Sequence, residues 1–316
     1  PLNSMGEVAY AVEDAPPRHA RRLDNRGLLA GILIGPAAIF ILVLVGGPLL
    51  LSLYLSLTDA TAGSLRGKFV GARNFLGAFA DPNFRRALAN TLTYTLISQI
   101  LVLVFAKVLA GSLVKRFRGK WLLRGLILLP WAAPVALTTI GWKWILDSLY
   151  SVLNWGLGVL QLMGCPERCP QWLGDPSKAA ASVVAVHTWR VLPFATVIIL
   201  AGLSSIPPEV EDAAEVDGAV GWRRTLHITL PMLAPIMTVA ALFGIIFTAT
   251  DMAVVYLLTS GGPFNSTHVL SSWAFQTGIV SGSLGPGAAI SLYLFPLLVA
   301  VAILMLRFAR RAETGL

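Results

Sequence analysis

Six stretches of this chain are each apolar over about 20 residues or more, the length that an α-helix needs to cross about 30 Å of hydrocarbon. They lie at about residues 28–55, 88–110, 122–145, 179–203, 233–257 and 286–307. Inside a bilayer the backbone hydrogen bonds have to be made within the protein, and a helix makes all of them within one segment. The composition agrees, because 56% of the residues are hydrophobic and 13% are charged, against about 25% charged in soluble domains. The sequence therefore predicts an all-α polytopic membrane protein with about six transmembrane helices.

The distribution of Lys and Arg predicts how these helices are oriented. With both termini inside, fifteen Lys and Arg residues fall in the inner segments and eight in the outer ones. An excess of these residues is typical of cytoplasmic loops, and the densest cluster is KRFRGK at residues 115–120. We interpret the net charge of +8 as this orientation signal and not as a nucleic-acid-binding surface. The prediction is a cell-membrane protein with both termini in the cytoplasm.

The chain is expected to form one transmembrane domain with two short tails. Residues 1–26 are polar and basic and are predicted to be a cytoplasmic tail, and residues 311–316 are predicted to be a second one. The transmembrane domain then covers residues 27–310. We expect residues 1–4 to be an addition ahead of a natural start at Met5.

A long run with polar character between two apolar stretches extends from residue 206 to residue 235. Pro207 and Pro208 end the preceding element, and Pro is well tolerated at the first position of a helix. Acidic residues follow in what would be the first helical turn, where they interact favourably with the helix dipole. Gly218 is expected to follow the end of this helix in a left-handed conformation. The segment is predicted to form a short exposed helix, a turn, and a second short helix that ends near Leu230 and Pro231, all in the cytoplasm.

Both cysteines of the chain, Cys165 and Cys169, lie in one polar loop that the charge distribution places outside. An oxidising compartment would favour a small disulfide between them, and two free thiols are the alternative. Two thiols without a neighbouring His do not complete a zinc site, so no metal is expected.

No catalytic signature is present. The sequence contains no G-x-x-x-x-G-K-[ST] phosphate-binding loop, no H-E-x-x-H and no G-x-S-x-G. The chain is therefore predicted not to be an enzyme. If it moves a solute uphill, the energy comes from an ion gradient or from a partner ATPase.

The 206–235 segment resembles the coupling loop, or EAA loop, of ABC importer permeases. The resemblance rests on DAAEVDGA at residues 212–219, Trp222, and I-T-L-P at residues 228–231 followed by Pro235. One departure is Asp212, which stands where the family usually has Glu. By this resemblance, contacts to an ATPase are expected at Glu211, Asp212, Ala213, Ala214, Asp217 and Gly218.

The wider chain, about residues 28–307, resembles the six-span permeases of the maltose-type branch of carbohydrate importers. Three segments carry this likeness, residues 142–154, 189–209 and 256–267. It implies a type I importer permease in the inner membrane that pairs with a second, related permease. It also implies two ATP-binding cassette subunits that use ATP and Mg²⁺, and an extracytoplasmic sugar-binding protein. No cofactor is expected on this chain.

Ionisable residues inside membrane spans are costly and are functional candidates. Three are found here, His187 and Arg190 in the fourth apolar stretch and Asp251 in the fifth. By the resemblance to maltose-type permeases, these residues and their neighbours are expected to line the path of the substrate. The candidates for this path are His187, Trp189, Arg190, Phe194, Phe247, Thr250 and Asp251. Two alternatives are that Arg190 and Asp251 form a buried ion pair that does not touch solute, and that His187 is a packing residue. A third is that the partner permease holds most of the solute contacts.

Two other functions compete with an importer permease. A secondary transporter or channel would work alone and would use Arg190 and Asp251 as an ion-coupled relay, although paired broken helices typical of inverted repeats are not apparent. A membrane scaffold would use the cytoplasmic loop to recruit a soluble protein. The identity of the sugar is not encoded in any of these patterns.

Overall fold

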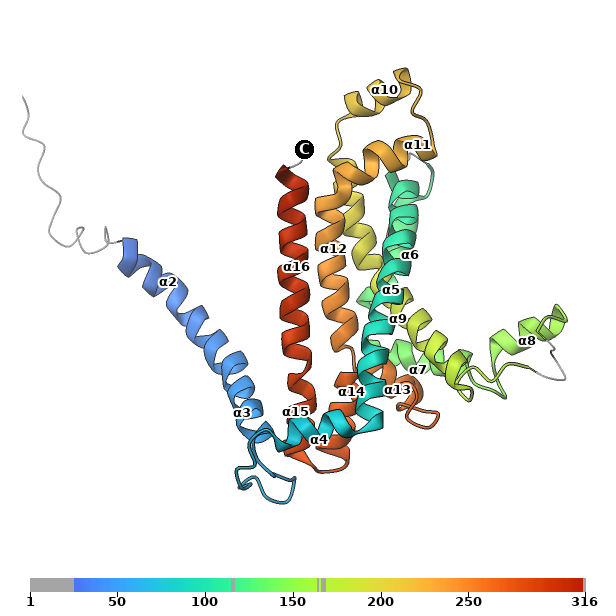
Figure 1. Cartoon of the computed structure of the whole chain (residues 1–316). Coiled ribbons are helices and arrows are strands. Elements are labelled where there is room, and N and C mark those ends of the chain that lie inside the picture. Colours follow the sequence, from blue (N-terminus) through green and yellow to red (C-terminus); the bar gives the residue numbers. More distant parts are fainter. Residues whose placement is uncertain (1–25, 115–116, 164, 166–168, 315–316) are drawn as a thin grey trace, which may run out of the picture. The chain divides into compact units, whose positions relative to one another are not determined.

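Figure 1 shows a computed structural model of the chain, which describes residues 26–114, 117–163, 165 and 169–314. Within these residues the chain is helical and has no strand beyond two isolated β-bridges, Thr58–Phe69 and Thr61–Ser64. Five helices are long and apolar enough to cross a membrane, or six if a bent pair is counted as one span. This confirms the predicted fold class. The tail predicted at residues 1–26 lies outside the described residues except for Arg26, as do residues 115 and 116 of the basic cluster.

The chain divides into two compact units, residues 1–52 and 53–316, and each is described by itself. The described part of the first unit comprises α2 (Arg26–Ile41), a π-helical turn η1 (Leu42–Gly46) and the beginning of α3 (Gly47–Ser56). This apolar run, which extends from Leu29 to Ser56, corresponds to the first predicted span.

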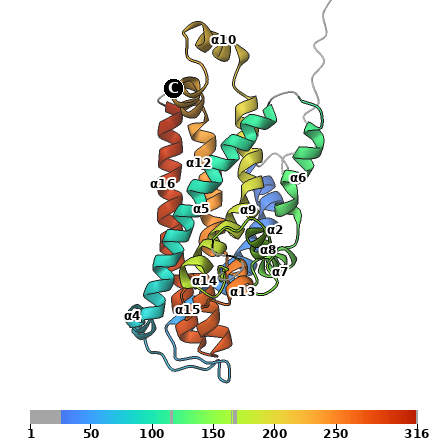
Figure 2. The same cartoon turned by 90° about the vertical axis from the view of Figure 1, so that its right-hand side faces the viewer.

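Four long helices form the bundle of the second unit (Figures 1 and 2). They are α5 (Pro82–Val114), α9 (Pro176–Ser204), α12 (Leu230–Thr250) and α16 (Leu294–Thr314). α12 contacts the other three, and α5 packs along α9. Small residues such as Ala106, Ala110 and Ala195 are buried between them, which lets the helix backbones approach closely. α16 continues to Thr314 and thus into the segment predicted to be a tail.

The third predicted span, 122–145, is not one helix. It consists of α6 (Lys120–Ala132) and α7 (Val135–Ile145), which meet at an angle of 96°. Pro134 has no N–H and disfavours the helical conformation of the residue before it, and Ala133 is accordingly extended, with φ −75° and ψ 144°. A proline inside one predicted span therefore separates two helices.

The fifth predicted span, 233–257, is also interrupted. α12 ends at Thr250, and a separate helix α13 (Ala253–Thr259) follows. Asp251 has an extended backbone, with ψ 97°, and its Oδ1 accepts a hydrogen bond from the Val254 N–H at 3.2 Å. The prediction that Asp251 lies inside a span is therefore wrong. It lies at the end of one, where its carboxylate caps the next helix.

Short elements cover one end of the bundle (Figure 1). They are α4 (Arg73–Ala80), α13, α14 (Leu270–Phe275), the π-helical turn η3 (Gln276–Val280) and α15 (Leu284–Leu292). Asn74 holds the chain after α3 in place, because its Nδ2 donates to the carbonyl oxygens of Ser56 and Thr58 at 2.8 and 2.7 Å. α8 (Val152–Val159) lies in the loop that follows α7, where Cys165 and Cys169 are joined in a disulfide.

Candidate functional site

The first candidate site is the helical loop between α9 and α12. Its helix α10 (Pro208–Val216) stands at the end of the bundle opposite to α4 and α15 (Figure 1). Pro208 occupies the first turn together with Glu209 and Glu211, as the sequence predicts. Gly218 has a φ of +73°, which confirms the predicted left-handed residue.

Two hydrogen bonds close the end of α10. The Gly218 N–H donates to the Glu215 carbonyl at 3.1 Å, and the Ala219 N–H donates to the Ala214 carbonyl at 2.8 Å. This pair of bonds is the Schellman motif, which satisfies carbonyl groups that the helix leaves unpaired. The turn is therefore a stable local structure, and a residue that cannot adopt positive φ would disrupt it.

The residues that the resemblance assigns to coupling differ in their exposure to solvent. Glu211, Asp212, Ala213, Asp217 and Gly218 are exposed. Ala214 is buried by the rest of the chain, so its methyl group packs inward. A partner that binds this helix would meet Ala213 and the acidic side chains but not Ala214.

The second half of this loop differs from the prediction. No helix ends at Leu230 and Pro231, because α11 (Trp222–Arg224), the π-helical turn η2 (Thr225–Thr229) and α12 form one uninterrupted helical run from Trp222 to Thr250. A proline inside a helix removes one backbone donor and crowds the preceding turn. Here Pro231 follows a π-helical turn, whose wider hydrogen-bonding pattern adapts the helix to such a residue.

The loop exposes apolar side chains as well as acidic ones. Val216 is 88% exposed, and Val220 and Trp222 are also exposed. Arg224 Nη1 and Glu211 Oε2 are 3.8 Å apart and both side chains are partly exposed, so this ion pair stabilises the loop little. Exposed apolar groups beside acidic ones at the end of a bundle are typical of a protein-binding surface.

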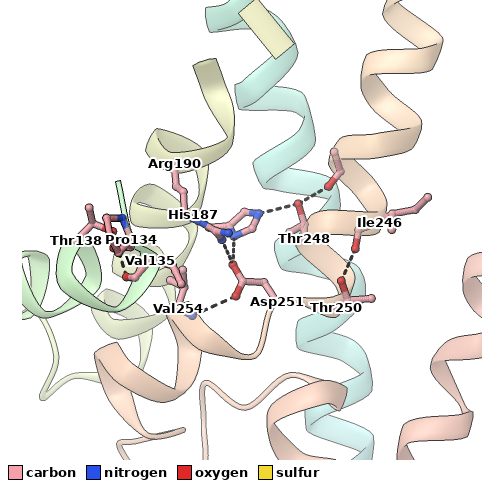
Figure 3. A network of polar contacts seen from close by, with 11 residues as sticks. Pro134, Val135, Thr138, His187, Arg190, Ile246, Thr248, Thr250, Asp251 and Val254 are labelled. Atoms are coloured by element: carbon pink, nitrogen blue, oxygen red, sulfur yellow. Dashed lines mark hydrogen bonds and ion pairs between the residues drawn. The ribbon is translucent and has the colours of Figure 1, made fainter. Parts of the chain in front are cut away.

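The second candidate site is a polar network where α9 passes the end of α12 (Figure 3). Asp251 Oδ2 accepts a hydrogen bond from Arg190 Nη1 at 2.6 Å and lies 2.9 Å from His187 Nδ1. His187 Nε2 lies 2.9 Å from Thr248 Oγ1, which in turn donates to the Gly244 carbonyl at 2.7 Å. A carboxylate only accepts, so His187 carries a proton on Nδ1. One carboxylate thus holds two side chains of α9.

This network contains the ion pair between Arg190 and Asp251, which was one of the alternatives left open by the sequence. The Asp251 side chain is 8% exposed and the Arg190 side chain is 25% exposed. His187 is buried and hydrogen-bonded at both ring nitrogens. Asp251 is therefore a buried partner, whereas the Arg190 guanidinium remains accessible in part. The sequence reasoning missed Thr248, although a hydroxyl three residues before a predicted functional Asp is a usable signal.

The predicted aromatic residues are divided between two places. Phe194 and Phe247 pack together, with ring centroids 5.4 Å apart, and Trp131 and Phe243 complete this cluster. Trp189 instead packs edge-on against Trp142, at 5.4 Å. The sequence reasoning did not select Trp131, Phe243 or Trp142, because they come from other elements or other helical turns and only packing brings them together.

Thr250 does not join the network. Its hydroxyl donates to the Ile246 carbonyl at 2.8 Å, and the residue is exposed (Figure 3). Within the described residues, no group of three or more His, Cys, Asp or Glu side chains is arranged to hold a metal ion. The site thus offers a partly accessible guanidinium and aromatic faces, which can bind a polar solute.

Comparison with known proteins identifies the family. Residues 103–314 match the model of the binding-protein-dependent transport system inner membrane component. The trehalose/maltose transport system permease protein MalF of Thermococcus litoralis is 31% identical over 282 residues, which cover 89% of this chain and 94% of that protein. The sulfoquinovosyl glycerol transport system permease protein SmoG of Agrobacterium fabrum is 33% identical over 299 residues, or 94% and 96% of the two chains.

Solved structures agree on the fold. A chain in the crystal structure of a bacterial ABC transporter involved in the import of the acidic polysaccharide alginate superposes with a TM-score of 0.77 at 19% identity, over 93% of this chain and 99% of that one. A second alginate transporter structure, in complex with a periplasmic protein bound to an alginate pentasaccharide, gives 0.76 at 20% identity and covers 93% and 98%. The chain therefore belongs to the family of inner membrane components of binding-protein-dependent transport systems.

Proposed function

We propose that this chain is the permease subunit of an ATP-driven importer, which moves a sugar or oligosaccharide across the inner membrane after an extracytoplasmic binding protein has delivered it. A second, related permease completes the path, and two partner subunits bind ATP and Mg²⁺ while this chain binds no cofactor. In this proposal both termini and α10 face the cytoplasm, as the Lys and Arg distribution predicts.

The observation that carries the proposal is the continuous connection between the two candidate sites. α10 leads through the Schellman turn into a single helical run of 29 residues, Trp222–Thr250. At 1.5 Å per residue this run is about 43 Å long, and it ends beside Asp251. A partner ATPase that binds α10 and changes conformation can therefore displace the network around Asp251 at the other end of this run. This requires that the ATPase binds the two states of the permease with different affinity.

A sugar is supported by the chemistry of the second site and by the relatives. Two of these relatives are described as permeases for trehalose/maltose and for sulfoquinovosyl glycerol. Sugars are bound by groups that hydrogen-bond their hydroxyls and by aromatic faces that stack on the ring. Arg190 and the cluster of Trp131, Phe194, Phe243 and Phe247 offer both. An ion-coupled transporter is favoured less, because Arg190 and His187 already occupy the Asp251 carboxylate.

The test is reconstitution of the chain with its partner permease, the ATPase subunits and the binding protein in proteoliposomes. We expect uptake of the sugar to require ATP and all partners. Uptake by this chain alone under an ion gradient would contradict the proposal.

Two variants test the coupling role of α10. Gly218→Pro is incompatible with the φ of +73°, and Asp212→Lys reverses an exposed charge. Both variants are expected to insert normally but to lose sugar-stimulated ATP hydrolysis and transport. The matched control is Arg66→Glu, a charge reversal at an exposed residue of the opposite end. Normal stimulated hydrolysis in both α10 variants would show that α10 does not couple the subunits.

A further inference from the structure

A small cavity lies beside the network of His187 and Asp251. Its volume is about 10 Å³. Tyr94 and Ser98 of α5 line it together with His187, Thr248 and Asp251, and the other lining residues are valines. The cavity therefore lies where three helices meet, next to the point at which the helical run of α12 ends.

Two residues of α5 that line this cavity carry buried hydroxyl groups. Tyr94 is 7% exposed and Ser98 is 1% exposed. Neither Tyr94 Oη nor Ser98 Oγ has a hydrogen-bond partner among the described residues. The two residues are four positions apart on one helix, so they lie on the same face. Buried polar groups of native proteins are nearly always hydrogen-bonded, and an unsatisfied one is costly.

Asp251, which also lines the cavity, has unused capacity to accept hydrogen bonds. An ionised carboxylate has about four acceptor positions. Three at Asp251 are used, by Arg190 and His187 at Oδ2 and by the Val254 N–H at Oδ1. One acceptor position is left on this carboxylate.

We propose that this cavity is a binding site for one ordered water molecule, which links the hydroxyl groups of Tyr94 and Ser98 to the Asp251 carboxylate. A water needs about 10–15 Å³ and two to four polar partners, and the cavity provides both. The water accepts from the two hydroxyls and donates to Asp251. A cation is disfavoured, because Arg190 and His187 already bind this carboxylate, and the volume excludes any larger solute.

This water connects α5 to the junction of α9, α12 and α13. Without it, the described hydrogen bonds of the Asp251 carboxylate come from α9 and from α13. Tyr94 and Ser98 are thus positioning residues, which hold the carboxylate through the water and do not contact a solute.

The sign of a stability change tests the proposal. Removal of a hydroxyl that has no partner leaves the melting temperature unchanged or raises it, whereas removal of one that binds a water lowers it. We expect Tyr94→Phe and Ser98→Ala to lower the melting temperature of the assembled transporter in lipid nanodiscs. The matched control is Thr95→Val. Its hydroxyl is also buried and without a partner among the described residues, but it lines an apolar groove between α5, α12 and α16 instead of the cavity.

Three outcomes would overturn the water site. They are an unchanged or raised melting temperature in Tyr94→Phe, an equal loss in Thr95→Val, and an experimental map that resolves other buried waters but shows no density within hydrogen-bonding distance of Tyr94 Oη or Ser98 Oγ. None of these measurements requires transport, so the water site and the proposed function can fail independently.

Discussion

The ion pair between Asp251 and Arg190 leads to a quantitative prediction. Asp251→Ala leaves the Arg190 guanidinium and His187 without their common acceptor. Loss of one partner of a buried pair typically costs about 3–5 kcal/mol. The Arg190 side chain is 25% exposed, so water can replace part of the interaction, and we expect a loss of about 3 kcal/mol, the lower end of that range.

The reciprocal change is expected to cost less. In Arg190→Ala the Asp251 carboxylate keeps His187 Nδ1 at 2.9 Å and the Val254 N–H at 3.2 Å. The loss is then one hydrogen bond between charged groups, about 2 kcal/mol. Arg190 acts through Asp251, so the double variant is expected to lose about 3 kcal/mol, and the coupling energy is about 2 kcal/mol.

The assay is a double-mutant cycle in mixed micelles, with the free energy of unfolding measured by SDS titration. Val197→Ala, at an exposed position of α9, is a control that leaves the network intact. Additivity of the two single variants within about 0.5 kcal/mol would show that the two side chains do not act as a pair.

Further variants test other parts of the structure. A Cβ at position 285 would lie 2.1 Å from the Thr58 carbonyl oxygen. Gly285→Ala is therefore expected to destabilise the protein by about 1–3 kcal/mol through overpacking. In the same thermal-shift assay, Gly77→Ala in α4 is expected not to lower the melting temperature, because the added Cβ meets no atom within 4 Å. Burial lowers the pKa of His268 below its usual value, so the native state favours the neutral ring. The stability that His268 contributes is complete above about pH 6.5 and is lost as the pH falls from there through the native pKa. The melting temperature of His268→Gln is therefore expected to vary less with pH over this range. A variant whose melting temperature varies with pH as in the native protein would exclude His268 as the source of this pH dependence.

The sequence alone determined the features that depend on local chemistry. Most of the apolar stretches coincide with the helices that fill them, because a membrane span is recognised by length and composition. The fifth stretch, 233–257, instead runs past the end of α12 at Thr250. The start of α10 and its left-handed Gly218 were predicted because Pro at a first helical turn and Gly after a last one each act on a single backbone position. The family was indicated by the same short segment, whose pattern resembles a coupling loop.

The sequence did not predict whether a proline inside an apolar stretch would end a helix or lie within one. Pro134 separates two helices at 96°, whereas Pro231 lies within one uninterrupted helical run. Both residues lack the same backbone donor. The chain turns where the residue before the proline is extended, as at Ala133, and continues where a π-helical turn precedes it, as at Thr225–Thr229. This difference is not encoded in the proline itself.

The candidate site is assembled by tertiary packing from residues that lie far apart in the sequence. His187 and Asp251 are 64 positions apart in the sequence, and Tyr94 and Ser98 come from a third helix. A helical pattern predicts which face of one helix is buried, but it does not specify which groups on other helices will face it. The sequence therefore identified Asp251 as a functional candidate from the cost of burying its charge, and tertiary packing supplied the partners that offset this cost.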